Sequence, residues 1–118
     1  MFGFEKLDVW QKAVDYADTI YLVTRTFPDD ERFGLTSQLR KASVSISSNI
    51  AEGSSRSSPA DFRRFIEIAY GSLLETVSEL KVAQRQGLVT MQTYDELYSQ
   101  AENLARMLSG LRQNLRRH

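Results

Sequence analysis

Apolar side chains return at steps of three and four residues in four segments of the chain, the spacing of an α-helix that buries one face. Residues that start or stop helices bound each segment. The pattern predicts helices over about residues 8–27, 35–52, 59–86 and 91–117.

The first two segments each carry an apolar stripe, which is narrow in the second and part of a broad apolar arc in the first. Asp8 is the expected N-cap of the first helix, and Pro28 stops it after Phe27. Its core face consists of Trp10, Ala13, Ala17, Ile20, Thr24 and Phe27. The second helix should end at Glu52, with Gly53 as a left-handed C-terminal cap. Its stripe consists of Leu35, Leu39, Ala42, Ile46 and Ile50.

The third and fourth segments are longer. Ser58, Pro59 and Asp61 combine an N-cap serine, a proline in the first turn and a carboxylate three residues after the cap. The third helix should run to about Gln86, ahead of Gly87. The fourth opens after Thr90, and its stripe is the seam of a supercoiled bundle. That stripe consists of Tyr94, Leu97, Ala101, Leu104, Leu108, Leu111 and Leu115.

The connections at about 53–58 and 87–90 are short enough to force antiparallel neighbours. We therefore expect an all-α fold, an up-down-up-down antiparallel four-helix bundle. A length of 118 residues, with 42% apolar and 25% charged residues, fits one domain over 1–118. The absence of cysteine and of a signal-like or membrane-anchoring N-terminal segment favours a cytoplasmic protein.

The second helix has a further strip of mostly small residues, Arg40, Val44, Ser47 and Ala51, away from its apolar stripe. Gly71 interrupts the third helix, where glycine is unfavourable by about 1 kcal/mol relative to alanine. A lone bundle needs one buried face per helix, so we infer self-association through these positions. The alternative is that the serines face solvent or bond to backbone carbonyls four residues earlier.

Charge is uneven although the formal net charge is zero and the pI is near 6.6. A binder of nucleic acid with this composition must act through a local basic surface. Two zones are basic. The first consists of Arg40, Lys41, Arg56, Arg63 and Arg64, and the second of Arg106, Arg112, Arg116 and Arg117.

Catalytic patterns are weak. A di-iron bundle needs Glu-x-x-His pairs, whereas the one histidine is His118. Glu67, Glu75 and Glu79 share one helix without histidine partners. Ser78 and Lys81 fit Ser-x-x-Lys but lack the companion motifs of that enzyme class. We expect no catalytic residue, no metal site and no cofactor.

Several segments resemble one known family in the right order: FEKLDVWQKA at 4–13, FP at 27–28, GLTSQLRKASVSISSNIAEG at 34–53, FRRF at 62–65 and IAYGSLLE at 68–75. The chain is identified as a member of the 23S rRNA intervening-sequence protein family, also called the four helix bundle protein family. The resemblance covers roughly residues 4–111, and SNIAEG at 48–53 is its specific element.

The resemblance implies a bundle protomer that assembles into a ring of five with a central channel. It also implies a bacterial protein, encoded inside ribosomal RNA genes or alone. The accessory protein of diversity-generating retroelements is similar and associates with a reverse transcriptase and with nucleic acid. That protein is strongly basic, unlike this chain.

We therefore expect a non-enzymatic homopentameric scaffold whose basic rim engages RNA or DNA. Symmetry would repeat the first basic zone around one rim, and the N-terminus of the third helix would add amide donors for phosphate. The alternatives are that Ser58 and Asp61 only cap this helix while the arginines are solvated or pair with acids, and that the ring binds only proteins. Trp10 and Tyr70 are expected to pack in the core. Asn49 and Glu52 could form a buried polar bond or a subunit contact.

Overall fold

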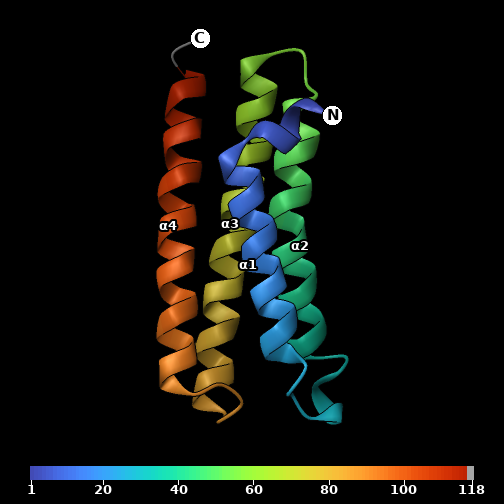
Figure 1. The fold of residues 1–118 in the computed structure, drawn as a ribbon, viewed down its shortest axis with the longest axis vertical. Helices are drawn as coiled ribbons and strands as arrows, with labels where there is room; N and C mark the ends of the chain where they lie inside the picture. The colour runs from blue at the N-terminus through green and yellow to red at the C-terminus, as the bar shows by residue number, and fades with distance from the viewer. Residues whose placement is uncertain (117–118) are drawn as a thin grey trace.

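Four long helices make up most of the structure, a computed structural model that describes residues 1–116. They are α1 (Asp8–Thr24), α2 (Leu35–Ser54), α3 (Pro59–Arg85) and α4 (Met91–Arg116), with the short 3-10 helices η1 (Gly3–Lys6) and η2 (Asp29–Glu31). The helices lie side by side in a rod of 45 × 22 × 21 Å (Figure 1). This part of the chain contains no strand, so the all-α prediction is confirmed.

Consecutive helices are antiparallel, because residues late in one helix meet residues early in the next. The Arg40 Nε donates to the Thr24 hydroxyl at 2.9 Å between α2 and α1. The Lys81 ammonium lies 5.0 Å from the centre of the Tyr94 ring between α3 and α4. The N-terminus, the α2–α3 connection and the end of α4 consequently lie at one end of the rod, the upper end in Figure 1.

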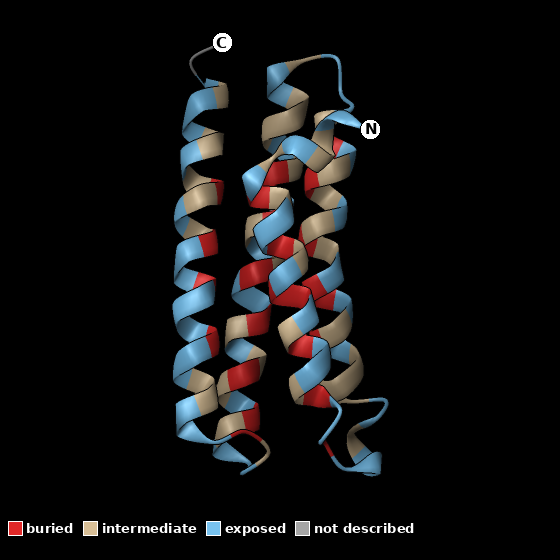
Figure 2. Ribbon diagram, viewed as in Figure 1, coloured by how far each residue is buried: buried red, intermediate tan, exposed pale blue. Residues whose placement is uncertain are grey.

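The core lies along the inward sides of all four helices (Figure 2). The predicted stripes of α2, α3 and α4 supply most of it. The predicted stripe of α1 is buried except for Trp10, which is half-buried, and Val9 and Tyr16 add to it. The largest fully buried aliphatic side chains are Ile20, Leu39, Ile46, Ile50, Ile66, Leu73, Leu80, Leu97, Leu104 and Leu108.

A buried hydroxyl pair crosses this core between α1 and α3. The hydroxyl oxygens of Tyr16 and Thr76 lie 2.8 Å apart, and Thr76 donates to the Leu73 carbonyl at 2.6 Å. Tyr16 is therefore the donor of the pair. Burial raises the pKa of Tyr16 to about 12, although the bond with Thr76 lowers it in part. The phenol stays neutral, and both polar groups are satisfied.

Some helix ends lie a few residues from their predicted positions. Asp8 is the first residue of α1 rather than its N-cap, a position that Leu7 takes without a side-chain bond. The helix ends at Thr24, and Phe27 reaches the core from the following turn. The left-handed glycine lies after α3 instead: Gly87 has a φ of 77°, and Leu88 donates to the Ala83 carbonyl, as in a Schellman motif.

Gly53 is not the cap that its position indicated. It lies inside α2, which continues to Ser54, and it is buried. A Cβ built on Gly53 would lie 2.6 Å from the Phe65 Cβ and 3.0 Å from the Phe62 ring. Glycine is therefore needed because α2 and α3 approach each other closely here, and not because the backbone turns.

Replacing Gly53 with alanine should lower the free energy of unfolding by about 1–3 kcal/mol, because the new methyl group overpacks the α2–α3 contact. Urea denaturation measures the change. The matched control is Gly110→Ala in α4, where no neighbouring atom lies within 4 Å of the new Cβ. The control should keep or gain stability, by up to about 1 kcal/mol. Equal stability of Gly53→Ala and wild type would contradict the close approach.

Candidate nucleic-acid interface

Basic side chains from two segments gather at the upper end of the rod. Arg56 follows α2, and Arg63 and Arg64 lie in the second turn of α3. Arg112 and Arg116 lie in the last turns of α4, which ends at the same level (Figure 1). We call these five arginines the basic end. The two basic zones of the sequence thus meet in part, while Arg117 lies outside the described residues.

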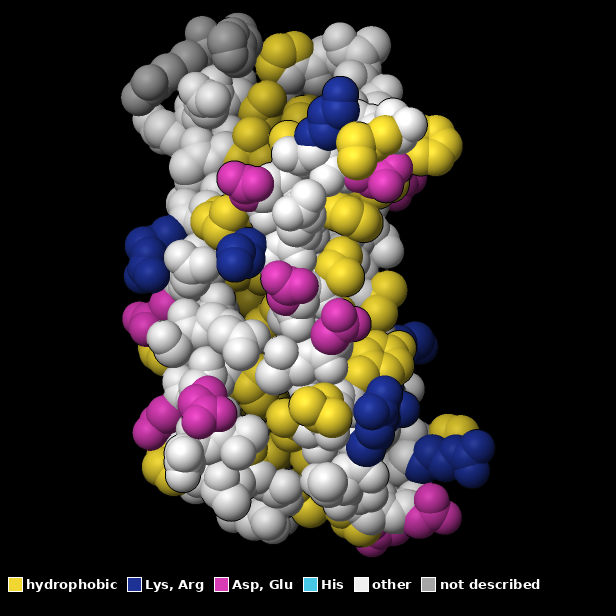
Figure 3. Space-filling view, in the orientation of Figure 1, with side chains coloured by type: hydrophobic (Ala, Val, Ile, Leu, Met, Phe, Trp, Pro, Cys, Tyr) yellow, Lys and Arg dark blue, Asp and Glu magenta, His cyan; other side chains and the backbone are white. Residues whose placement is uncertain are grey.

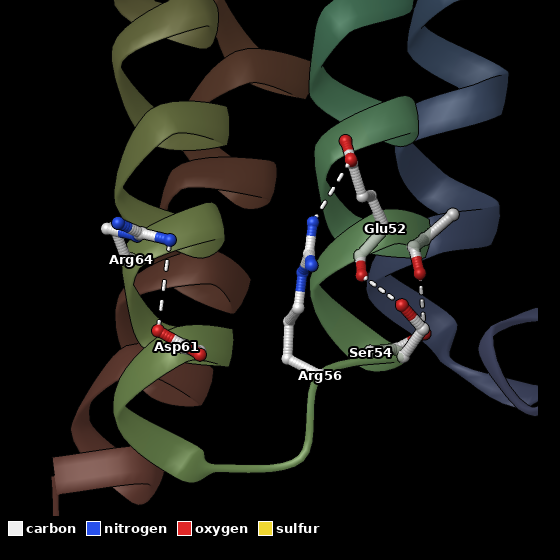
Figure 4. Close-up of polar contacts among 7 residues, drawn as sticks. Glu52, Ser54, Arg56, Asp61 and Arg64 are labelled. Atoms are coloured by element: carbon white, nitrogen blue, oxygen red, sulfur yellow. Dashed lines mark hydrogen bonds and ion pairs between the residues drawn. The ribbon is translucent and has the colours of Figure 1, made fainter.

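Phe65 organises two of these arginines. The Arg56 guanidinium lies 4.5 Å from the centre of the Phe65 ring, and that of Arg64 lies 5.7 Å from it. Each also faces a carboxylate (Figure 4): Arg56 lies 3.2 Å from Glu52, and Arg64 lies 3.8 Å from Asp61. Exposed pairs of this kind are worth at most about 1 kcal/mol, so a phosphate can compete for both guanidinium groups.

The other three arginines of the basic end are Arg63, Arg112 and Arg116. Within residues 1–116 no carboxylate lies within salt-bridge distance of Arg63, Arg112 or Arg116. The Arg112 guanidinium lies 5.1 Å from the centre of the Tyr70 ring, which ties the end of α4 to α3. The sequence marked the arginines of α4 as a separate basic zone, because nothing in it placed Tyr70 beside them.

The N-terminus of α3 offers few amides to a ligand. The Ser58 hydroxyl accepts from the Asp61 amide at 3.1 Å, which confirms the predicted cap. The Phe62 amide donates to the Ser58 carbonyl, and Pro59 has no N–H. The Asp61 carboxylate faces Arg64 (Figure 4) and adds negative charge to the first turn. Contact with phosphate would therefore come from arginine side chains rather than from this helix end.

Arg40 and Lys41 do not lie with the basic end. They are in the second turn of α2, on the order of 20 Å along the helix from Arg56 at 1.5 Å per residue. Arg40 is engaged within the chain: it donates to the Thr24 hydroxyl and to the Tyr21 carbonyl, and it lies 4.6 Å from the centre of the Tyr21 ring. Its guanidinium thus stabilises the carbonyl end of α1.

The small-residue strip of α2 is covered in part by the chain itself. Ala51 lines a hollow of about 400 Å³ together with Phe4, Leu7 and Phe62, so η1 lies over this end of the strip. Val44 is 41% exposed, and the Ser47 hydroxyl bonds to the Val44 carbonyl. The middle of the strip faces outward.

Gly71 also faces outward on α3, because no neighbouring atom lies within 4 Å of a Cβ built there. The chain itself therefore gives no packing reason for a glycine at this helical position. Its neighbour Ser72 is used, since the Ser72 and Ser45 hydroxyl oxygens lie 3.0 Å apart between α3 and α2.

The remaining polar and aromatic candidates have partners within the chain. Asn49 donates to the Ser45 carbonyl at 2.8 Å, and Glu52 pairs with Arg56. Trp10 packs edge-on against Phe4 with ring centres 5.0 Å apart. Trp10 and Tyr70 are both half-buried against the core, as the stripes indicated.

One carboxyl group is perturbed. The Oε1 atom of Glu79 is buried without a hydrogen-bond partner in the described part of the chain. Partial burial, and secondarily the Glu75 carboxylate, raise the pKa of Glu79 from 4.5 to about 7. Within residues 1–116 no three His, Cys, Asp or Glu side chains come together as metal ligands, and no helix has the length and apolar character to cross a membrane.

The family model of the 23S rRNA-intervening sequence protein matches residues 5–110. The chain belongs to this family. The fold is also that of a crystal structure from Bacteroides thetaiotaomicron, a protein of unknown function from the S23 ribosomal protein family. The TM-score is 0.79 at 23% sequence identity, over 87% of this chain and 96% of that one. No curated protein matches this chain significantly.

Substituting Glu79 with glutamine should stabilise this family member at pH 8 and flatten its stability profile. The raised pKa means that the folded state binds the proton more tightly than the unfolded state, so stability falls as pH rises from 4.5 through about 7. Because the group is partly open to water, we expect a gain on the order of 1 kcal/mol. Urea denaturation between pH 4.5 and 8 measures it, with Glu67→Gln on the exposed side of α3 as control. A profile for Glu79→Gln that parallels wild type would contradict the assignment.

Proposed function

We propose that this protein is a non-enzymatic, cytoplasmic scaffold that binds RNA or DNA through the basic end. Its protomer is an up-down-up-down bundle that assembles into a homo-oligomeric ring, a pentamer by the family resemblance. The observation that carries the proposal is the convergence of five arginines, from the start of α3 and the end of α4, on one end of a protein whose net charge is zero.

Electrostatics explains why this convergence matters. Affinity for a nucleic acid depends on the number of phosphates that are neutralised, so an even spread of charge on a neutral protein would bind weakly. Here three arginines of the basic end have no carboxylate within salt-bridge distance among the described residues, and two have only exposed partners. A ring with its axis along the rod would repeat the cluster on one surface and multiply the phosphate contacts.

Exposed apolar side chains support self-association. The outer side of α3 carries Ile68, Leu74 and Val82, each about half exposed, together with the uncrowded Gly71. Val44 on α2 is also exposed. Packing against another copy would remove these side chains from water, which is favourable by about 25 cal/mol per Å² of apolar surface. Light scattering that found only a 13.5 kDa monomer would remove the ring from the proposal.

A protein-binding ring without a nucleic-acid partner is the second candidate. The pairing of Arg56 with Glu52 and of Arg64 with Asp61 favours it, since both pairs reduce the charge that a phosphate would meet. The two functions differ in their response to salt.

Binding of single-stranded RNA should be detectable by electrophoretic mobility shift at about 50 mM salt and should fall steeply at about 200 mM. Replacing Arg56, Arg63 and Arg64 together with alanine should weaken binding at low salt at least about tenfold and reduce the salt dependence, because three phosphate contacts are lost.

The matched control replaces Arg25, Arg32 and Arg85 with alanine. It removes the same charge from exposed positions at the opposite end of the rod (Figure 1) and should bind nearly as wild type does. Equal losses of RNA affinity in both triple variants would show that only net charge matters and would contradict a localised interface. If wild type binds neither RNA nor DNA at low salt, the protein-binding ring is the remaining candidate.

A further inference from the structure

A polar cleft runs between α1 and α4, away from the basic end. Its volume is about 280 Å³. The walls carry Lys12, Asp15 and Thr19 from α1 and Gln100 and Asn103 from α4, and the floor consists of the buried side chains Tyr16 and Leu104. In the same orientation as Figure 1, Figure 3 shows charged side chains beside the seam of these two helices and apolar surface inside it.

The groups on the walls are available to a ligand. Lys12 and Asp15 lie one turn apart on the same side of α1, yet they form no salt bridge. Thr19 donates to the Asp15 carbonyl, which leaves the Asp15 carboxylate unused by that bond. Asn103 makes only a 3.9 Å contact with the Met107 sulfur, and Gln100 has no hydrogen-bond partner among the described residues. Lys12, Asp15, Gln100 and Asn103 are all exposed, so each side chain is free to turn toward a ligand in the cleft.

The cleft suits a flat, polar group in size and chemistry. The volume lies just below the range of about 300–1,000 Å³ that is usual for small-molecule sites. Such sites are lined mainly by apolar side chains with a few polar groups, whereas most of this lining is polar, which suits a ligand with several hydrogen-bonding groups. One wall presents an ammonium donor next to a carboxylate with two acceptor oxygens. The facing wall presents two carboxamides, which both donate and accept.

Among the four bases, guanine matches the wall of α1. Its Watson–Crick edge carries the O6 acceptor beside two adjacent donors, N1–H and N2–H. Adenine, cytosine and uracil each present only one donor group on that edge. The Lys12 ammonium can donate to O6 while both oxygens of Asp15 accept from N1–H and N2–H. The carboxamides of Gln100 and Asn103 are left for the opposite edge of the base.

We propose that the cleft between α1 and α4 binds an unpaired guanine base, with Asp15 and Lys12 reading its Watson–Crick edge. The biological role of this site rests on the proposed binding of nucleic acid, because single-stranded RNA is read by contacts to the exposed edges of its bases. The chemistry of the site is separate from that of the basic end, because it recognises a base and not a phosphate.

Nucleosides test the cleft without involving phosphate. Guanosine, inosine and adenosine are titrated into the ¹⁵N-labelled protein to about 1 mM, and amide shifts of α1 and α4 are followed by NMR. We expect guanosine to bind best, inosine more weakly because it lacks the 2-amino group, and adenosine least. Asp15→Asn should weaken guanosine binding at least about tenfold and abolish the preference over inosine.

The matched control is Asp18→Asn, an exposed carboxylate of α1 that does not line the cleft, and it should bind guanosine as wild type does. Circular dichroism checks that both variants remain folded. Three outcomes would each overturn the inference. Guanosine and adenosine could bind equally well, guanosine at about 1 mM could cause no amide shifts around the cleft, or Asp15→Asn could bind guanosine as wild type does.

The Arg56, Arg63 and Arg64 triple variant separates the two proposals. It should lose affinity for RNA and retain guanosine binding. If guanosine fails to bind wild type while RNA still binds in a salt-dependent way, the cleft is wrong and the basic end stands. If guanosine binds but RNA does not, the basic end is wrong and the cleft stands.

Discussion

The close approach of α2 and α3 at Gly53 is the constraint on which the upper end of the structure depends. No side chain fits between the Gly53 backbone and Phe65, so the end of α2 lies directly on the start of α3. This contact lets the connection be short and holds the Phe65 ring where the Arg56 and Arg64 guanidinium groups lie on it. A larger residue at position 53 would separate the helices and move the basic side chains that they carry.

Chain topology then brings arginines from distant parts of the sequence together on a protein whose net charge is zero. The antiparallel order of the helices brings the end of α4 to the level of the start of α3, so arginines about fifty residues apart in sequence share one end of the rod. The other end carries acids, in the Asp29–Glu31 turn and at Asp95 and Glu96, together with the exposed arginines Arg25, Arg32 and Arg85. A local cluster of arginines can create a positive surface potential that net charge does not reveal.

Much of the architecture could be predicted because helix periodicity and caps are local signals. The four helices, the Ser58 cap and the end of the third helix ahead of Gly87 follow from spacing and residue type. The role of Gly53 could not be predicted, because the sequence does not distinguish a glycine required for close helix packing from a glycine that caps a helix. The basic rim was predicted in part: Arg40 binds the end of α1, whereas Arg112 joins through its contact with Tyr70. The α1–α4 cleft escaped prediction because its walls come from helices at opposite ends of the sequence.

Hydrogen exchange of the protein with and without a single-stranded RNA at low salt tests the central claim most directly. The account predicts that RNA slows exchange in residues 55–64 and in the last turns of α4, where the basic end lies. It predicts no change in residues 25–35 at the opposite end. Protection confined to residues 25–35, or none anywhere while RNA is bound, would contradict it.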